Sequence, residues 1–311
     1  MFHRTFTFPD YPACFLVAED EDSHRVLGFL HYLYPGAFPL AVQDAGYLTV
    51  VMVDPECRGR KVGAQLLHAA LASLRPLDAT HVLLNNDNPY QLTWRIPDTP
   101  GYDHNNMPGV DQECTGHDFF LHEGFTVTAS EVSLYMPLAA FRLSPEIQKT
   151  REALAKEGIL TGFLDPSRPW DYDGMCDRVH SEYWRDVLRT ELAAWHTDTP
   201  NADPRFWADG KRPSAPRPML TAVKNGEIIG FTGPVDLQSS GRGWFTGICT
   251  DPRYQRKGIG TVLFSLLMDT FRSRGAAFAS IFTGTDNRAQ RIYIASGMQP
   301  VRIFDQLTLN L

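Results

Sequence analysis

The chain has 311 residues, of which 43% are hydrophobic and 21% are charged. These values exclude intrinsic disorder for the bulk of the chain, because disordered chains combine low hydrophobicity with high net charge. The length predicts two domains. The net charge of −7 argues against nucleic acid as a partner, since nucleic acid is bound by a basic face.

The sequence shows no sign of a membrane span, an export signal or a metal site. No run reaches the roughly 18 consecutive apolar residues that a span needs, and residues 1–12 lack a basic flank followed by an apolar run. The five cysteines are scattered and form no C-x-x-C pair, which predicts free thiols in a reducing compartment. We expect a cytoplasmic protein without bound metal or membrane partner, either a monomer or a homodimer.

The first half of the chain predicts a hairpin, a strand–loop–helix unit, a further strand, an insertion, and a closing helix with a terminal strand. The loop is basic and contains glycine, and the helix after it has apolar residues on one face at helical spacing. In chain order, these elements are the strands 15–18 and 26–32, the strand ending at Asp54-Pro55, the helix from Val62, the strand 81–84, the insertion 89–114 and the strand 131–136.

The second half begins with a linker helix and then repeats the first. Ser144-Pro145-Glu146 is typical of a helix start, with an N-cap, a proline and an acidic residue in order. Asn225-Gly226 between apolar runs predicts a tight hairpin. In chain order we expect a helix to Gly158, a strand at 159–164, one or two helices over 172–195, a loop at 197–218, the hairpin strands 219–223 and 227–232, a strand ending at Asp251-Pro252, a helix from Ile259, a strand at 278–282, a closing helix and a strand at 301–309.

The two halves contain an internal repeat. Residues 47–64 and 244–261 align without gaps, each residue having its counterpart 197 positions later. A strand that feeds a basic, glycine-rich loop at the start of a helix builds an anion site, because unpaired N–H groups and the helix dipole point at the ligand. The two loops therefore predict phosphate-binding sites; the alternative is a tight turn that only serves helix entry.

The second copy carries a family resemblance. Gln255-x-x-Gly258-x-Gly260, after a strand ending in Asp-Pro, is similar to the acyl-CoA signature of the GNAT superfamily of N-acetyltransferases. The residues Asn287, Ala289, Ile292, Tyr293 and Gly297 resemble the closing helix of that family. The resemblance covers about 158–311, with a weaker copy in 1–137, and the arrangement resembles bacterial two-domain GNAT proteins.

The resemblance implies an α/β (α+β) fold of two tandem GNAT-like domains, each a mixed, mainly antiparallel central sheet flanked by helices. We expect a degenerate domain at 1–137 that lacks the N-terminal helices, a linker helix at 138–157 and a complete acetyltransferase domain at 158–311. It also implies acetyl-CoA as the acetyl donor and coenzyme A as product. The residues implied in binding acetyl-CoA are Ile248, Cys249, Thr250, Gln255, Arg256, Lys257, Gly258, Ile259, Gly260, Thr261 and Asn287.

The implied mechanism is direct attack of a neutral primary amine on the thioester in a ternary complex. A backbone N–H of the motif strand polarises the carbonyl, and Tyr293 protonates the leaving thiolate. Asn287 has two open roles, binding the pantetheine arm or capping the closing helix. Unlike many family members, the chain has Thr246 and Gly247 where a carboxylate base stands. By position only, Asp236, His180, His196 and Glu182 are candidate bases.

The first copy departs from the signature. Lys61 replaces the first motif glycine and Phe120 stands where Tyr293 stands, so we expect the second copy to do the chemistry. The residues leave open whether the first copy still binds coenzyme A, and we expect weaker binding or none. The residues of that second site would be Arg58, Gly59, Arg60, Lys61, Val62, Gly63 and Ala64.

The leading hypothesis is an acetyl-CoA-dependent N-acetyltransferase acting on a small-molecule or peptide amine. Two alternatives stay open: an N-acyltransferase that uses a different acyl-CoA, and a non-catalytic acyl-CoA sensor or scaffold. Release of thiol in the presence of an amine distinguishes an enzyme from a sensor.

Overall fold

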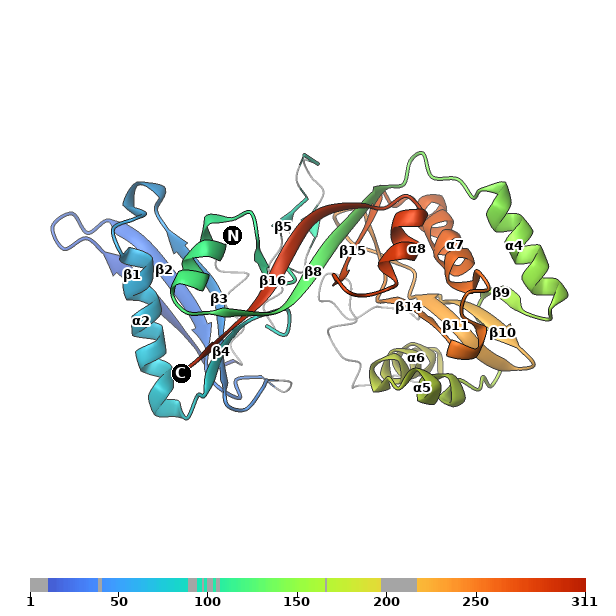
Figure 1. Cartoon of the computed structure of the whole chain (residues 1–311), viewed down its shortest axis with the longest axis horizontal. Helices are drawn as coiled ribbons and strands as arrows, with labels where there is room; N and C mark the ends of the chain where they lie inside the picture. The colour runs from blue at the N-terminus through green and yellow to red at the C-terminus, as the bar shows by residue number, and fades with distance from the viewer. Residues whose placement is uncertain are drawn as a thin grey trace. The chain divides into compact units, whose positions relative to one another are not determined.

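A computed structural model describes residues 11–38, 41–88, 94–96, 98–99, 103–104, 107–165, 167–196 and 217–311 (Figure 1). The predicted loop 197–218 lies mostly outside these residues, and the insertion 89–114 lies partly outside them. Within them, no helix is long and apolar enough to cross a membrane, and no group of three His, Cys, Asp or Glu side chains is placed to hold a metal ion.

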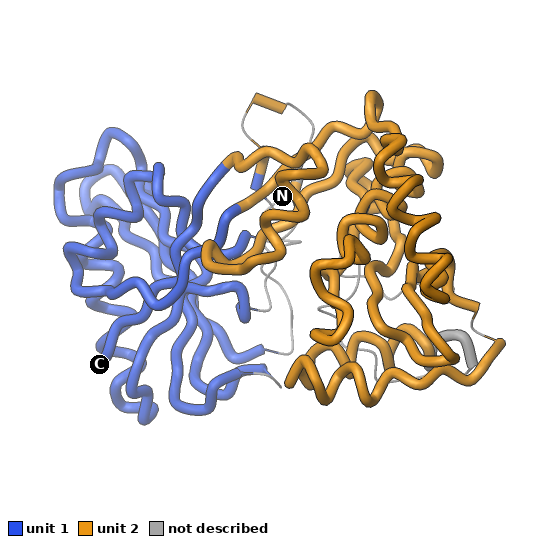
Figure 2. The backbone as a smooth tube through the Cα atoms, turned by 45° about the vertical axis from the view of Figure 1, so that its right-hand side comes forward, with its two compact units in different colours: residues 1–94, 105–132, 302–311 blue, residues 95–104, 133–301 orange. Residues whose placement is uncertain are grey.

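The chain forms two compact units, coloured separately in Figure 2. Unit 1 comprises residues 1–94, 105–132 and 302–311, and unit 2 comprises residues 95–104 and 133–301. This division differs from a contiguous one at residue 137. The strand β8 (Thr126–Pro137) belongs to unit 1 up to Val132, and β16 (Gln299–Asn310) belongs to unit 1 from Arg302. Each unit thus includes the end of a strand that begins in the other.

Unit 1 is a mainly antiparallel sheet with the strand order β1-β2-β3-β4-β16-β8. β3 and β4 pair in parallel, whereas β1 with β2, β2 with β3 and β16 with β4 pair antiparallel. The helix α2 covers one face and packs its leucines against Leu30, Tyr32 and Leu48 in the core. The elements are β1 (Ala13–Glu19), β2 (Val26–Leu33), β3 (Ala45–Val53), η1 (Pro55–Cys57), α2 (Val62–Leu74), η2 (Arg75–Leu77), β4 (His81–Leu84), β7 (Val110–Asp111) and α3 (Thr115–His122). The insertion contains the short strands β5 (Trp94–Arg95) and β6 (Asp103–His104), of which residues 95–104 belong to unit 2.

Unit 2 contains an antiparallel sheet of order β14-β11-β10-β9 and the strand series β8-β15-β13-β12. One face packs against α7, whose Ile259 and Leu263 lie close to Gly230 on β11. On the other face, α5 and α6 pack against Phe231 and Trp244. The elements are α4 (Pro145–Lys156), β9 (Leu160–Phe163), α5 (Asp173–Val179), α6 (Glu182–His196), β10 (Leu220–Lys224), β11 (Glu227–Gly233), β12 (Asp236–Leu237), β13 (Arg242–Trp244), β14 (Gly247–Thr250), η5 (Pro252–Tyr254), α7 (Ile259–Ser273), β15 (Phe278–Gly284) and α8 (Gln290–Ala295).

The predicted fold class is confirmed, and so are the local elements that carry it. Both hairpins form with antiparallel pairing, β1 with β2 and β10 with β11. Asn225 and Gly226 have φ angles of 52° and 84°, as the tight turn between two strands requires. Ser144 accepts a hydrogen bond from the Ile147 N–H at the start of α4, which is the N-cap that the sequence predicts.

Candidate active site

The motif strand of unit 2 divides in two. Its first part, β13, pairs in parallel with β15 through Gly243, and its second part, β14, pairs with β11 instead. At the division, the N–H and the hydroxyl of Thr246 both donate to the Gly233 carbonyl, at 2.9 and 2.8 Å. The motif strand therefore separates from β15 after Trp244, and its second part, β14, forms the edge of the sheet β14-β11-β10-β9.

Along one edge of β14, main-chain groups point away from β11. The Asp251 N–H donates to Ile229 O at 2.9 Å, so alternate residues from Asp251 back along the strand face β11. Ile248 and Thr250 consequently direct their N–H and C=O groups away from β11. Such an unpaired edge can hydrogen-bond an extended amide-containing ligand, as the sequence predicts for these residues and a pantetheine arm.

Unit 1 has the same arrangement. β3 pairs with β4 only over residues 45–47, and the register with β2 skips Thr49. The Asp54 N–H donates to Leu27 O at 2.8 Å, which turns the main-chain groups of Val51 and Val53 away from β2. The internal repeat of the sequence is therefore also a repeat of the separated strand.

The two glycine-containing loops share one backbone path. Positive φ angles occur at Gly59 and Arg256, with 75° and 64°, and again at Lys61 and Gly258, with 66° and 84°. Each loop thus has two residues in the left-handed conformation, only one of which is glycine. The glycine is the first of the two in the first loop (Gly59) and the second of the two in the second loop (Gly258). Lys61 adopts the conformation of Gly258, so the missing glycine does not alter the path of the first loop. The helices α2 and α7 begin at the next residue, Val62 and Ile259.

An arginine holds the Asp-Pro turn in front of each loop. Asp251 is fully buried; its carboxylate accepts hydrogen bonds from Arg178 on α5, at 2.6 and 3.0 Å, and from Arg253. Burial alone raises the pKa of Asp251, but the hydrogen bonds from Arg253 and Arg178 outweigh it and hold that pKa below its usual value. In unit 1, the more exposed Arg25 contacts Asp54 at 2.5 Å.

Replacing Arg178 by Met should lower the free energy of unfolding by about 3 kcal/mol, because it removes a partner of a buried charge. Since the folded pKa of Asp251 lies below its unfolded value, the stabilisation is complete above about pH 4 and disappears as the pH falls through the folded pKa. Urea unfolding at pH 7 and pH 3 measures both effects. Arg25→Met is the control, with an expected loss below about 1 kcal/mol; equal losses for the two variants would contradict this account.

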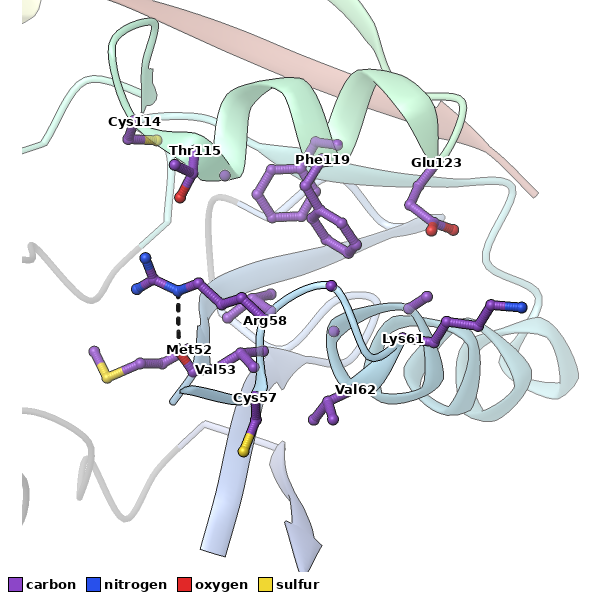
Figure 3. A pocket seen from close by; sticks show the side chains of 16 residues that line it. Met52, Val53, Cys57, Arg58, Lys61, Val62, Cys114, Thr115, Phe119 and Glu123 are labelled. Atoms are coloured by element: carbon purple, nitrogen blue, oxygen red, sulfur yellow. Dashed lines mark hydrogen bonds between the residues drawn. The ribbon is translucent and has the colours of Figure 1, made fainter. Parts of the chain in front are cut away.

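A cavity of about 620 Å³ lies at the first loop, in unit 1 (Figure 3). The end of β3 and the loop form one wall, and α3 forms the other with Phe119 and Phe120. Six of the seven residues predicted for a second coenzyme A site line the cavity; Arg60 does not. The lining residues are Val51, Met52, Val53, Cys57, Arg58, Gly59, Lys61, Val62, Gly63, Ala64, Cys114, Thr115, Gly116, Phe119, Phe120 and Glu123.

The loop of unit 2 is more closely surrounded. A Cβ atom at Gly260 would lie 2.8 Å from Ile292 of α8 and 3.7 Å from Ile248, and one at Gly258 would lie 2.8 Å from Thr150 of α4. Both contacts are with the ends of side chains; Gly258 in addition has a φ of 84°, which favours glycine. Lys257 pairs with Glu157 at 2.6 Å. Gln255 lies beside the motif strand, with its side-chain amide 3.4 Å from Thr250 O.

Tyr293 on α8 is buried at the point where the motif strand divides. Its ring packs on Phe264 of α7, with centroids 5.0 Å apart, and lies 6.5 Å from the ring of Phe245. Burial raises the pKa of Tyr293 well above its usual value, so the phenol stays protonated at neutral pH, as a general acid must.

Asn287 forms hydrogen bonds within unit 2, and Cys249 is buried in its core. Asn287 Oδ1 accepts from the Ala289 N–H at 2.9 Å, ahead of α8, and its Nδ2 donates to Thr283 at 2.7 Å. This bond lies in the turn before α8, whose N-cap residue is Ala289, so both roles considered for Asn287 stay predictions. Burial raises the pKa of the Cys249 thiol to about 12, so the thiol is no nucleophile at neutral pH. Cys249 is in register with Phe231 on β11, and its main-chain groups face that strand rather than the free edge of β14.

The place of the usual base is taken by an indole that the sequence analysis did not identify. Gly247 has a φ of 146°, and a Cβ atom there would lie 2.7 Å from Trp184 of α6. Of the candidate bases, His180 is exposed at the end of α5, Glu182 is exposed and pairs with Arg185, and Asp236 is held by Arg217. The His196 side chain lies outside the described residues.

Comparison with known proteins agrees with this geometry. The model of the Acetyltransferase (GNAT) family matches residues 2–92 and 177–298. Because these segments cover more than half of the chain and fall in both copies of the repeat, the chain belongs to the GNAT acetyltransferase family and is an acyltransferase. A search of curated proteins finds no significant match.

Solved structures share the two-domain fold at low identity. A GCN5-related glucosamine N-acetyltransferase region in a fungal multi-domain GH3 beta-N-acetylglucosaminidase is 16% identical, with a TM-score of 0.63, over 96% of this chain and 33% of that one. A GCN5-related N-acetyltransferase from Sphaerobacter thermophilus (14%, TM-score 0.53) aligns over 92% and 78% of the two chains. A tandem GNAT protein from the clavulanic acid biosynthesis pathway (14%, TM-score 0.51) aligns over 97% and 84%. The chain spans a third of the fungal protein.

Proposed function

We propose that the protein transfers an acetyl group from acetyl-CoA to a primary amine of a small molecule or peptide, and that unit 2 does this chemistry. The observation that carries the proposal is the divided motif strand, which directs the main-chain groups of Ile248 and Thr250 away from β11, beside the loop before α7. Of these groups, the Thr250 carbonyl accepts a hydrogen bond from Gln255 Nε2 at 3.4 Å. Family membership supports acyl transfer, and the buried Tyr293 at the division supports its placement in unit 2.

The residues of unit 2 divide the work. Bound acetyl-CoA would supply the acetyl thioester. Ile248 and Thr250 hold the pantetheine arm along the free edge of β14, whereas the main-chain groups of Cys249 face β11. The N–H groups of residues 256–261 take the diphosphate at the start of α7. A strand N–H at the division polarises the carbonyl for direct attack by the amine. Tyr293 donates its proton to the leaving thiolate.

The cavity of unit 1 supports a second coenzyme A site without transfer chemistry. Its lining includes two cations, Arg58 and Lys61, and the β3 residues Val51 and Val53, whose main-chain groups point away from β2. The Val53 carbonyl accepts a hydrogen bond from Arg58 Nε at 3.3 Å (Figure 3). Phe120 has no proton to give where unit 2 has Tyr293. We expect binding weaker than in unit 2, which calorimetry with acetyl-CoA measures; two equal sites would contradict this part of the proposal.

Thiol release tests the proposal directly. Wild-type protein is incubated with acetyl-CoA and each member of an amine panel, and the acetylated amine is identified by mass spectrometry. The panel includes amino sugars, because the fungal region in the first comparison is named a glucosamine N-acetyltransferase, together with amino acids, alkylamines and peptides. We expect amine-dependent release of coenzyme A. Tight binding of acetyl-CoA without release for any amine would favour the sensor, and turnover only with longer acyl groups would change the donor.

A further inference from the structure

A buried layer of polar side chains lies on the face of unit 2 that packs against α6. Gln238 N donates to Arg242 O at 2.9 Å, so these two residues are opposed across β12 and β13 and share a face. Arg242 pairs with Phe278 in register, which places Ser280, two residues further on β15, on that face too. Trp244, two residues beyond Arg242, lies on the same face and contacts the α5 and α6 core.

Two members of this layer are left with unused donors. The Arg242 guanidinium donates to Ser280 O at 2.7 and 3.1 Å and to Gln238 Oε1 at 3.1 Å, which fixes the orientation of the Gln238 amide. Gln238 is 4% exposed and Ser280 is 2% exposed. Among the described residues, none pairs with Gln238 Nε2 or with Ser280 Oγ. Buried donors without acceptors are costly, so both groups favour a ligand that supplies oxygen.

The layer is close to the reacting end of the site. Trp244 is the last residue before the motif strand leaves β15, and the Arg217 guanidinium lies 5.0 Å from the centre of its ring. Arg217 binds the buried Glu191 of α6 and also Asp236 of β12, at 3.3 Å. Asp236 is the partly exposed member. The two carboxylates, Glu191 and Asp236, are offset by the two guanidinium groups, Arg217 and Arg242, so this layer carries no net charge.

We propose that Gln238 and Ser280 form an acceptor subsite that binds an oxygen of the amine substrate, so that the preferred acceptors are amines carrying a hydroxyl or a carboxylate. The inference rests on the proposed acetyl transfer in unit 2 and names its substrate class. Gln238 Nε2 and Ser280 Oγ donate to the substrate oxygen, and the amine extends past Trp244 toward the division of the strand. Both are positioning residues for the acceptor.

The experiment starts from the best acceptor of the amine panel and compares it with the same amine in which a methyl group replaces the hydroxyl or carboxylate. Wild type should lose about tenfold or more in kcat/KM with the methyl analogue, because the buried donors are then unpaired. Ser280→Ala and Gln238→Glu should reduce that preference through KM. Gln238→Glu keeps the acceptor for Arg242 and loses the donor. Thr161→Val on β9 removes another buried hydroxyl without a partner and should leave the preference unchanged.

The outcomes separate the two proposals. If the best acceptor carries no oxygen, or if the methyl analogue and both variants react as wild type does, the two donors hold only water and the subsite is refuted while acetyl transfer stands. If no amine is acetylated, the proposed function fails and the subsite fails with it. A preference that both variants reduce, with the melting temperature and the KM for acetyl-CoA unchanged, supports the subsite.

Discussion

Gly260→Glu should abolish acetyl transfer, with a fall in kcat/KM for acetyl-CoA of at least about 100-fold. Gly260 is packed between β14 and α8, because a Cβ atom there would lie 2.8 Å from Ile292, 3.7 Å from Ile248 and 3.8 Å from Thr250. A glutamate side chain would disrupt this packing and place a negative charge beside the start of α7. Like charges brought together cost several kcal/mol, and each 1.36 kcal/mol corresponds to about tenfold in rate.

The internal repeat supplies the matched control. Gly63→Glu makes the same change at the equivalent loop position of unit 1, where a Cβ atom has 3.5 Å to Phe119 and to Val53. This variant should lose coenzyme A binding in the unit 1 cavity and keep the turnover of wild type. Gly260→Ala tests packing alone, because its methyl group meets only the flexible end of Ile292. If Gly63→Glu abolished turnover and Gly260→Glu preserved it, the transfer chemistry would belong to unit 1.

Local elements were predictable because each depends on residues close in sequence. The Asn225-Gly226 turn, the Ser144 cap and the apolar face of α7 each require only one short window. The membership of the terminal strands was not predictable in the same way. The apolar pattern of residues 301–309 indicates a strand, but any sheet with a free edge can pair with it. In the structure, β16 belongs to unit 1 from Arg302 onward.

The glycine rule explains a difference between the expected and the observed loops. Substitution of a motif glycine by Lys61 suggested a degenerate loop. The structure shows two left-handed residues in each loop, at Gly59 and Lys61 in one and at Arg256 and Gly258 in the other. Non-glycine residues adopt this conformation at a cost in conformational energy. Each loop contains one such residue, Lys61 in the first and Arg256 in the second. Comparing only the position of Lys61 and Gly258 therefore suggests a larger difference between the two loops than their backbones show.

The polar layer and Trp184 could not be predicted from spacing. Glu191, Arg217 and Asp236 meet only through tertiary structure, and Trp184 is one of several aromatic residues in the segment 172–195, where no spacing marks it as a site residue. A signal did exist: Arg242 is a charged residue inside an apolar strand, where burial requires partners. Its guanidinium reaches Ser280 of another strand, which no local pattern reveals.

Tyr293→Phe should lower kcat and kcat/KM for acetyl-CoA together, by about 100-fold, because the hydroxyl acts only when the thiolate leaves. The ring remains between Phe264 and Phe245, so packing and the melting temperature should stay close to those of wild type. Stopped-flow or steady-state thiol release with the best acceptor measures the change. Tyr254→Phe, in η5 of the same unit, serves as the control and should retain wild-type kcat.

The pH dependence of kcat gives an independent check on the same hydroxyl. Burial raises the pKa of Tyr293, and an acid whose pKa lies above the usual value of about 10 stays protonated across the assay range. Ionisation of Tyr293 should therefore cause no decline in the wild-type kcat below about pH 10. The wild type and Tyr293→Phe should then have kcat profiles of the same shape over this range. A decline centred near pH 8 that the variant removes would mean that the hydroxyl ionises in the working range, and an unchanged kcat in the variant would assign the proton donor to another group.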